Sequence, residues 1–212
     1  MERLAAAIER TGLVLGEPLI VFGSAPLQIF LDPAFLSADV DVTVTGHLKE
    51  LQALVEETGM GKGRAPFYIE IVPRYVFRPG PDWGVRARRL ELHGVELVFP
   101  APLDLLVAKL HRLDEKDLRA FELVRQKTGQ PGEEELLQEL RQCHEKFTPR
   151  PSGAKSDFHR NVERLWPRLF GRELDAGRSI LQPVLDALRQ AGESEDYLTV
   201  LRSLGAVDDD KH

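Results

Sequence analysis

The stretch Asp39-Val40-Asp41-Val42-Thr43-Val44 decides how the rest of the chain is interpreted. Its strict alternation of polar and β-branched residues predicts a strand with two different faces. Asp39, Asp41 and Thr43 share one face, and the three valines share the other. Two carboxylates side by side repel each other unless a cation lies between them. We therefore expect this strand to hold a divalent metal ion with its aspartates.

A strand, a turn and a short helix precede this stretch. Leu19–Phe22 is a short continuous apolar run, which predicts a buried strand. Gly23-Ser24 ends it, and Ala25–Leu31 has helical spacing with a proline in the first turn. The glycine lets the backbone approach a ligand, and the N–H groups that open the helix offer an anion site. We expect a phosphate here beside the metal, which together make a nucleoside triphosphate site.

A third carboxylate is expected on a neighbouring strand. Phe67–Val72 predicts such a strand, with Ile69 and Ile71 facing away from Tyr68 and Glu70. Glu70 is the best candidate for the third ligand, because a charged residue within an apolar strand is unexpected unless it binds something. The alternative is an edge-strand residue that faces water. An oxygen-only set suits Mg²⁺, or Mn²⁺, which completes its shell with water and substrate phosphates.

The predicted secondary structure changes near Pro100–Pro102 from mixed helices and strands to helices alone. Before this point the spacing predicts helices at Glu2–Thr11 and Leu48–Thr58 and a hairpin over Arg89–Phe99. After it only helices are predicted, at Leu103–Arg112, Glu115–Gln126, Glu133–Phe147, Asp157–Phe170, Leu174–Ala191 and near Tyr197. We predict an α+β fold, with a mixed-sheet core at 1–100 and an all-helical region at 101–212 packed on it. Residues 148–155 have the composition of a linker.

Composition places the chain among ordinary globular proteins. Of its 212 residues 42% are hydrophobic and 29% are charged, which excludes a disordered chain, a collagen and a coiled-coil rod. A single cysteine allows no internal disulfide and favours a cytoplasmic location. The longest uncharged stretch, Pro18–Leu31, is too short to span a membrane, and the N-terminus is too charged for a signal peptide.

The distribution of charge bears on partners. A net charge of −6 and the lack of a helix-turn-helix pattern argue against a plain nucleic-acid-binding module. Residues 60–90 nevertheless carry seven Lys or Arg residues against two acidic ones. This segment is either solvated surface or a patch that meets phosphate. We expect an acidic acceptor to approach near Arg74–Arg89.

The succession of strand, Gly23-Ser24, short helix and Asp39-Val40-Asp41 strand resembles the nucleotidyltransferase superfamily of DNA polymerase β type. Within it, the chain looks most like the nucleotidyltransferase-like proteins related to the AbiEii toxins of bacterial toxin–antitoxin systems. A Ser or Thr commonly lies two residues before the aspartate pair in those proteins, and Ser37 fits. They also carry a helix with a Lys and then an acidic segment, which Lys109 and Glu115-Lys116-Asp117 match. The resemblance covers about residues 18–127.

This resemblance implies transfer of a nucleoside monophosphate from a triphosphate to a hydroxyl acceptor. The acceptor would be tRNA, as in the toxins, or a protein or small molecule, and a cognate antitoxin protein would be a partner. The implied catalytic and metal-binding residues are Asp39, Asp41 and Glu70, and the implied nucleotide-binding residues are Gly23, Ser24 and Lys109. Glu70 would help to activate the acceptor hydroxyl, and Lys109 would meet the triphosphate unless it is an ordinary surface lysine.

A second hypothesis stays open at this point. Glu70 stands where the superfamily more usually has Asp, and Ala120 stands where relatives often have another Asp. The helical half is also large. These features are compatible with a catalytically silent binding protein on the same scaffold, which acts in a complex.

Overall fold

The computed structural model describes residues 1–31, 38–64 and 67–191. The chain divides into two compact units, Met1–Leu105 and Leu106–His212. The first holds a five-stranded mixed sheet, and helices follow it along the chain, which confirms the predicted α+β class. The domain bounds of 1–100 and 101–212, and the packing of the helical region on the sheet, stay predictions.

The sheet has the strand order β3-β2-β1-β5-β4. Its strands are β1 (Leu19–Phe22), β2 (Asp39–Thr43), β3 (Tyr68–Val72), β4 (Arg88–Leu92) and β5 (Val95–Phe99). Strands β1 and β5 are parallel, as are β2 and β3, whereas β1–β2 and β4–β5 are antiparallel. Each strand agrees with its expected range to within one residue at either end.

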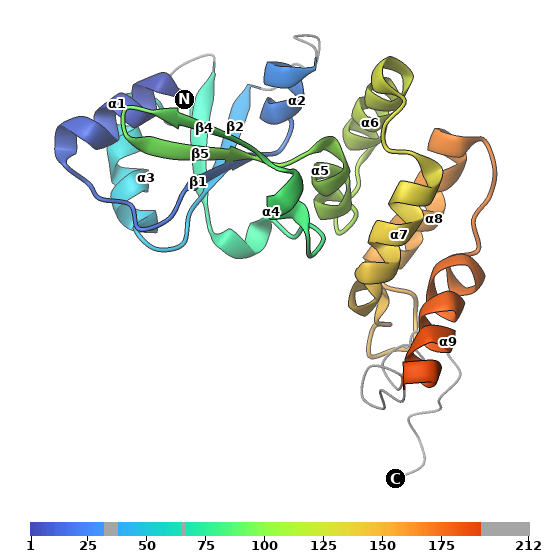
Figure 1. The fold of residues 1–212 in the computed structure, drawn as a ribbon. Coiled ribbons are helices and arrows are strands. Elements are labelled where there is room, and N and C mark those ends of the chain that lie inside the picture. Colours follow the sequence, from blue (N-terminus) through green and yellow to red (C-terminus); the bar gives the residue numbers. More distant parts are fainter. Residues whose placement is uncertain (32–37, 65–66, 192–212) are drawn as a thin grey trace. The chain divides into compact units, whose positions relative to one another are not determined.

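One face of the sheet forms the core of the first unit. Figure 1 shows α1 (Glu2–Thr11) and α3 (Leu48–Glu57) together on this face. The strands turn alternate residues towards these helices, so Val42 and Leu97 are fully buried there. Leu4 and Leu51, from the two helices, are equally buried. The apolar positions that predict these helices and strands are therefore the positions that the fold buries.

The β4–β5 hairpin turns at His93-Gly94, as the sequence indicates. Both residues have positive φ, 51° and 70°. Two consecutive residues in this region make the tight turn whose twist suits a two-residue hairpin, and glycine adopts it without strain. The turn brings β4 back along β5 at the edge of the sheet.

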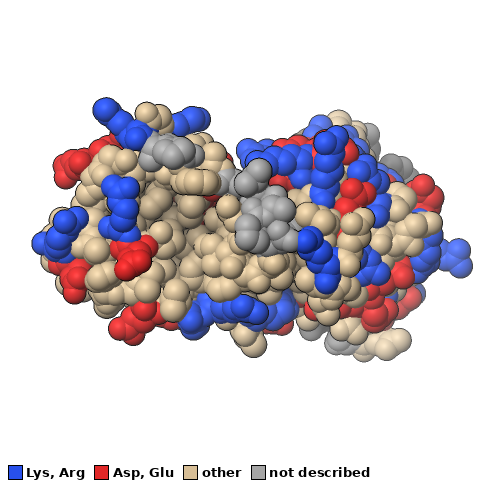
Figure 2. Space-filling view, turned by 90° about the horizontal axis from the view of Figure 1, so that it is seen from above, with Lys and Arg blue, Asp and Glu red and all other residues tan. Residues whose placement is uncertain are grey.

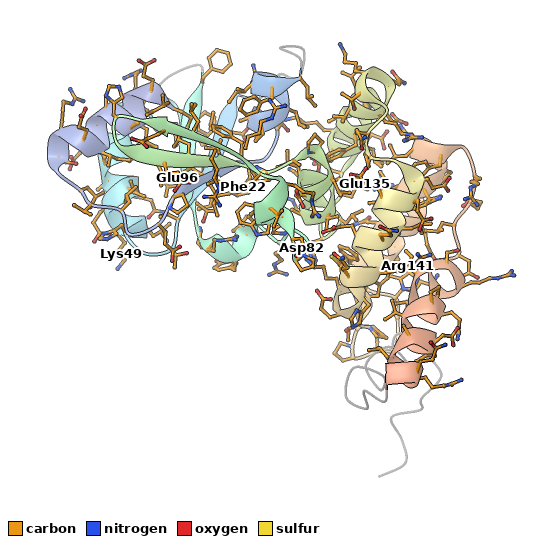
Figure 3. All side chains as sticks on the ribbon, viewed as in Figure 1. Phe22, Lys49, Asp82, Glu96, Glu135 and Arg141 are labelled. Carbon is orange, nitrogen blue, oxygen red and sulfur yellow. The ribbon has the colours of Figure 1, made fainter. Side chains whose placement is uncertain are left out.

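The other face of β1 is covered by the segment between β3 and β4. After β1, the chain first forms α2 (Ala25–Phe30). The segment 73–87 contains the 3-10 turn η1 (Arg74–Val76) and the short helix α4 (Trp83–Arg86). Its Phe77 ring packs on Phe22, with ring centroids 5.1 Å apart, and Trp83 packs edge-on against Phe77. Figure 3 labels Phe22. Neither η1 nor α4 was expected, because each is shorter than the repeat that reveals a helix.

The second unit is built from helices. Helix α5 (Pro102–Lys109) leads into it from the first unit, and the bounds of the others are α6 (Glu115–Thr128), α7 (Glu133–Gln142), η2 (His144–Phe147), α8 (Asp157–Phe170), η3 (Gly177–Leu181) and α9 (Gln182–Ala191). Trp166 lies fully buried in its core and donates its indole N–H to Glu133, 3.1 Å away. Helix α8 agrees with its expected range at both ends.

Several helices after the sheet begin or end away from the expected residues. Helix α5 ends at Lys109 where Arg112 was expected, and α6 ends at Thr128 where Gln126 was expected. Helix α7 ends at Gln142, and its expected extension to Phe147 is the 3-10 turn η2. The last turn of a helix often tightens in this way. Regular helix was also expected over Leu174–Ala191, but its first part is the π-helical turn η3, which runs directly into α9. The Asp175 carboxylate, just before this turn, accepts the backbone N–H of Arg178, 3.0 Å away. The helix expected near Tyr197 lies outside the described residues.

No helix among the described residues is long and apolar enough to cross a membrane. The expected linker, 148–155, runs without helix or strand between η2 and α8.

Candidate functional site

The register of three strands brings the three predicted acidic residues together. Asp41 lies opposite Phe22 of β1 and opposite Glu70 of β3, and Asp39 lies opposite Tyr68. Residues paired across strands point to the same face. One carboxylate oxygen of Asp39, Asp41 and Glu70 each lies within 4.8 Å of the others. The two aspartates are half-buried and Glu70 is exposed, so the cluster is open to solvent on one side.

Gly23 closes the β1 side of this acidic cluster. Its φ is +72°, and a Cβ atom built on it would lie 2.3 Å from Oδ2 of Asp41. No other residue type fits there without displacing the carboxylate. The Asp41 side chain therefore points at the Gly23-Ser24 turn. A metal held by Asp41 would then lie beside a phosphate held at that turn, as the sequence predicts.

Ser24 begins α2 directly after this glycine. It is half-buried, and its side chain makes no capping hydrogen bond to the helix. A serine at this position usually caps the helix with its hydroxyl. The role of Ser24 as a phosphate contact stays a prediction.

The acidic cluster fits a divalent ion. All three side chains offer oxygen, the ligand type that Mg²⁺ and Mn²⁺ take. Oxygen ligands on opposite sides of one Mg²⁺ lie about 4.2 Å apart, so a small rotation of the side chains suffices to bring all three onto one ion. The missing Cβ of Gly23 leaves Asp41 the room for that position.

Thr43 lies behind the cluster on the same face of β2. It is fully buried, and its hydroxyl oxygen has no hydrogen-bond partner among the described residues. A buried hydroxyl without a partner destabilises the fold. We find no structural reason for a threonine at this position.

Lys109 lies in the second unit, where its ammonium group forms an ion pair with Asp117, 3.1 Å away. Asp117 is buried and also completes a capping box with Asp114 at the start of α6. The backbone N–H of Asp117, together with nearby Lys109, holds the pKa of Asp114 below its usual value against the opposing effect of burial. The Lys and Asp of the motif thus contact each other, and a contact of Lys109 with triphosphate stays a prediction.

The arginines at the start of the basic stretch Arg74–Arg89 have contacts within the first unit. Arg74 lies over the rings of Phe77 and Trp83, 5.5 and 5.4 Å from their centroids. Burial lowers its pKa from the ordinary value, although Glu17 opposes this. Arg78 donates to the backbone oxygen of Tyr75, 2.9 Å away.

The later arginines of this stretch are held as well. Arg86 binds the fully buried Asp104 with two nitrogens, 2.5 and 3.2 Å from the carboxylate oxygens. Arg88 lies over the Phe30 ring at 4.9 Å. Arg89 forms an ion pair with Glu96 at 2.6 Å. These cations hold segment 73–87 and strand β4 in place, so the expected approach of an acidic acceptor here has no support from their contacts.

Charges are mixed over the viewed surface. Figure 2 shows Lys and Arg interspersed with Asp and Glu on the face that it presents. Among the described residues, that face carries no broad basic field that would attract any nucleic acid.

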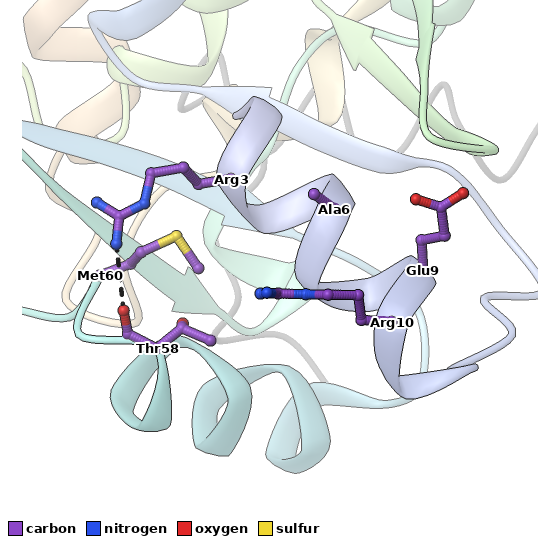
Figure 4. Close-up of a pocket in the computed structure, with 6 residues that line it drawn as sticks. All are labelled: Arg3, Ala6, Glu9, Arg10, Thr58 and Met60. Carbon is purple, nitrogen blue, oxygen red and sulfur yellow. Dashed lines mark hydrogen bonds between the residues drawn. The ribbon is translucent and has the colours of Figure 1, made fainter.

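A hollow on the other side of the sheet is separate from the acidic cluster. It lies between α1 and the end of α3, where Arg3 donates to the backbone oxygen of Thr58, 3.3 Å away (Figure 4). Both helices cover the core face of the sheet, whereas the carboxylates lie on the opposite face. The hollow therefore takes no part in the candidate site.

Two residues beside the cluster were not singled out as site residues by the sequence analysis. Tyr68 lies opposite Asp39 on the acidic face, and the ammonium of Lys62 lies 5.9 Å from the centre of its ring. Alternation along β3 already placed Tyr68 with Glu70, which is the signal that could have found it. The position of Ser37, expected before the aspartate pair, lies outside the described residues.

Comparison with known proteins agrees with this geometry. Neither the curated proteins nor the solved structures contain a significant match to the chain. A family model described as "Nucleotidyltransferase of unknown function (DUF6036)" matches residues 2–126, which include the whole sheet and the acidic cluster. It supports the superfamily and does not single out the AbiEii-type proteins. Because this match spans more than half of the chain, the protein belongs to that nucleotidyltransferase family.

Proposed function

We propose that the protein is a metal-dependent nucleotidyltransferase, which moves a nucleoside monophosphate from a nucleoside triphosphate to a hydroxyl acceptor. The observation that carries this proposal is the meeting of three carboxylates beside Gly23. The family match supports the same class of reaction. Carboxylates next to a glycine turn suit a metal-bound triphosphate, because the metal ion must lie between the acidic side chains and the anionic phosphates that the turn would hold.

Different residues bind the metal, bind the phosphates and accept the proton. Asp39 and Asp41 hold Mg²⁺, which when bound neutralises the phosphate charge and orients the reacting groups. Ser24 and the backbone N–H groups beside it hold the phosphates that leave. Glu70, the most exposed of the three acids, accepts the proton of the acceptor hydroxyl. The acceptor oxygen then bonds to the α-phosphorus, the bond from that phosphorus to the bridging oxygen breaks, and pyrophosphate leaves.

Three classes of molecule could supply the acceptor hydroxyl. The AbiEii resemblance implies tRNA as the acceptor and an antitoxin as the partner, so tRNA is the first acceptor to test. Lys109 is the further phosphate contact that the same resemblance implies. A protein or a small molecule with a free hydroxyl is tested alongside.

The decisive variant is Asp39→Asn with Asp41→Asn. It keeps the side-chain size and removes the charges that bind the metal, so transfer of label from radioactive triphosphates should fall by about 10³-fold or more. The matched control is Glu91→Gln with Glu96→Gln. These two residues are exposed, lie opposite each other on β4 and β5, and share the sheet face with the aspartates. Glu96 is labelled in Figure 3.

The control should transfer label at the rate of the unchanged protein. Equal transfer by the aspartate variant and the control contradicts the proposal. Binding of triphosphate and Mg²⁺ without transfer to any acceptor supports the silent binding protein instead.

Metal binding can be tested without an acceptor. A ligand that binds only the folded state at about ten times its dissociation constant raises the free energy of unfolding by about 1.4 kcal/mol. We expect Mg²⁺ to raise the thermal unfolding temperature of the unchanged protein and of the glutamine control. It should leave the Asp39→Asn, Asp41→Asn variant unaffected. A Mg²⁺ response that persists in this variant places the ion elsewhere.

A further inference from the structure

Two cations in the loop before β3 differ in their contacts from those of Arg74–Arg89. Lys62 and Arg64 lie in a turn that the Arg64 N–H closes on the backbone oxygen of Gly61, 3.2 Å away. Both side chains are exposed. Neither forms an ion pair with any residue in the ranges 1–31, 38–64 and 67–191. Lys62 lies over the Tyr68 ring, but no carboxylate of the described residues neutralises either cation, whereas Arg86 and Arg89 are paired with Asp104 and Glu96.

Tyr68 links this turn to the acidic cluster. Its position on β3 is opposite Asp39 and two residues before Glu70, so its ring stands on the same face as the three carboxylates. Ile69 and Ile71 turn the other way into the core. The ring is half-buried, and the Lys62 ammonium lies 5.9 Å from its centre. An aromatic surface and a cation therefore adjoin the third carboxylate.

The arrangement of the strands assigns this pair to the acceptor side. The Gly23-Ser24 turn follows β1, and β3 is the outer strand of the sheet, two places away. A triphosphate held at that turn reaches the aspartates of β2 from the β1 side. The attacking hydroxyl then comes from the opposite side, past Glu70 and Tyr68. This step depends on the proposed function, because it takes the cluster to be the place of transfer.

We propose that Tyr68 and Lys62 bind a single-stranded nucleic acid as the acceptor. An unpaired base stacks on the Tyr68 ring, an interaction that tolerates any base because each has a flat π-face. Lys62 is a compact point charge suited to a backbone phosphate. A ring with a cation over one of its faces presents both groups to a strand in which bases and phosphates alternate. The terminal ribose hydroxyl then lies next to Glu70.

Binding of a labelled RNA tests this without requiring catalysis. The probe is a fluorescent single-stranded RNA of about 12 nucleotides, within the usual site size of such grooves, and its anisotropy is measured with the full chain. Tyr68→Leu should weaken binding about tenfold, because it removes the stacking surface. Tyr68→Phe keeps the ring and should bind as the unchanged protein does. The control is Tyr75→Leu on η1, at a tyrosine that is 69% exposed and is therefore more accessible than the half-buried Tyr68.

The charge contribution has its own pair of variants. Lys62→Ala should weaken RNA binding at low salt and reduce the slope of log affinity against log salt by about 0.7, the value for one phosphate contact on a single strand. Lys49→Ala is the control, since Lys49 is exposed on α3, which covers the opposite face of the sheet (Figure 3). It should change neither the affinity nor the slope.

The results separate this proposal from the proposed function. Absence of RNA binding by the unchanged protein overturns it, as does equal loss in Tyr68→Leu and Tyr75→Leu. If the label is transferred to a protein acceptor, and Tyr68→Leu does not reduce this transfer, the proposal is also overturned and the acceptor is a protein. Calorimetry with Mg²⁺ and a triphosphate should give normal binding for Tyr68→Leu and Lys62→Ala. If the variants show the expected RNA affinities but no label is transferred, the RNA-binding site is supported and only the proposed transfer reaction is contradicted.

Discussion

The two faces of strand β2 show how one short segment serves both the fold and the candidate site. Val42 points into the core beneath α1 and α3 and is fully buried. Asp39 and Asp41, its neighbours along the same strand, lie half-buried on the other face with Glu70. The two faces have the same backbone and differ in what covers them. The valine face is closed by helices, and the aspartate face stays open on the side of the exposed Glu70.

This difference separates stability from function within a few residues. Changes on the valine face remove buried apolar area and lower the free energy of unfolding. Changes on the aspartate face remove charge at an open site and should lower activity instead. The loss of transfer expected for Asp39→Asn with Asp41→Asn is the largest effect on the aspartate face. The following variants test whether the separation holds.

Val42→Ala tests the core face. It leaves a cavity where two buried methyl groups were, which should lower the free energy of unfolding by about 2 kcal/mol. Denaturant unfolding measures this loss. Stabilisation by Mg²⁺, measured on the same variant, should be unchanged. A variant that keeps its stability but loses the response to Mg²⁺ breaks the division between the two faces.

Gly23→Ala tests the corner where the strand meets the site. An alanine at φ +72° is strained by about 1 kcal/mol, and its Cβ displaces the Asp41 carboxylate. We expect a modest loss of stability together with weaker binding of Mg²⁺. Gly12→Ala is the matched control, because Gly12 has φ +67° and nothing within 4 Å of an added Cβ. Loss of Mg²⁺ binding in both variants contradicts a specific role for Gly23.

Thr43→Val tests the buried end of the aspartate face and should have the smallest effect. Because the hydroxyl of Thr43 has no partner among the described residues, its replacement by a methyl group should stabilise the fold by about 1 kcal/mol. Thr128→Val is the control, since the Thr128 hydroxyl donates to the backbone oxygen of Val124, 2.8 Å away. It should lower stability. Destabilisation by Thr43→Val indicates that the hydroxyl has a partner in solution.

Much of the fold could be predicted because its signals are local. Alternation marks β2, a continuous apolar run marks β1, and a two-residue turn marks the β4–β5 hairpin. Elements η1 and α4 escaped prediction because three or four residues are too few to show a helical repeat. The π-helical turn η3 directly before α9 also escaped prediction, because five residues are too few to reveal a change of helical repeat.

The residues of the site were predictable in type but not in their contacts. The aspartate pair and Gly23 are visible as a motif. The use of Arg86 to bind buried Asp104, and of Lys109 to bind Asp117, is not visible, because each pair lies apart in the sequence. A basic stretch therefore resembles a phosphate-binding patch until its contacts are known.

The sequence by itself determined which residues alternate along each strand and where the chain turns, because backbone conformation depends on near neighbours. Only the tertiary structure decided that Glu70 joins the aspartates, that Tyr68 stands beside them, and that Lys62 is the cation next to that ring. These relations depend on strand order and register, which follow from packing between distant segments. A shift of the β2–β3 register by one residue would turn Glu70 into the core and dissolve the site.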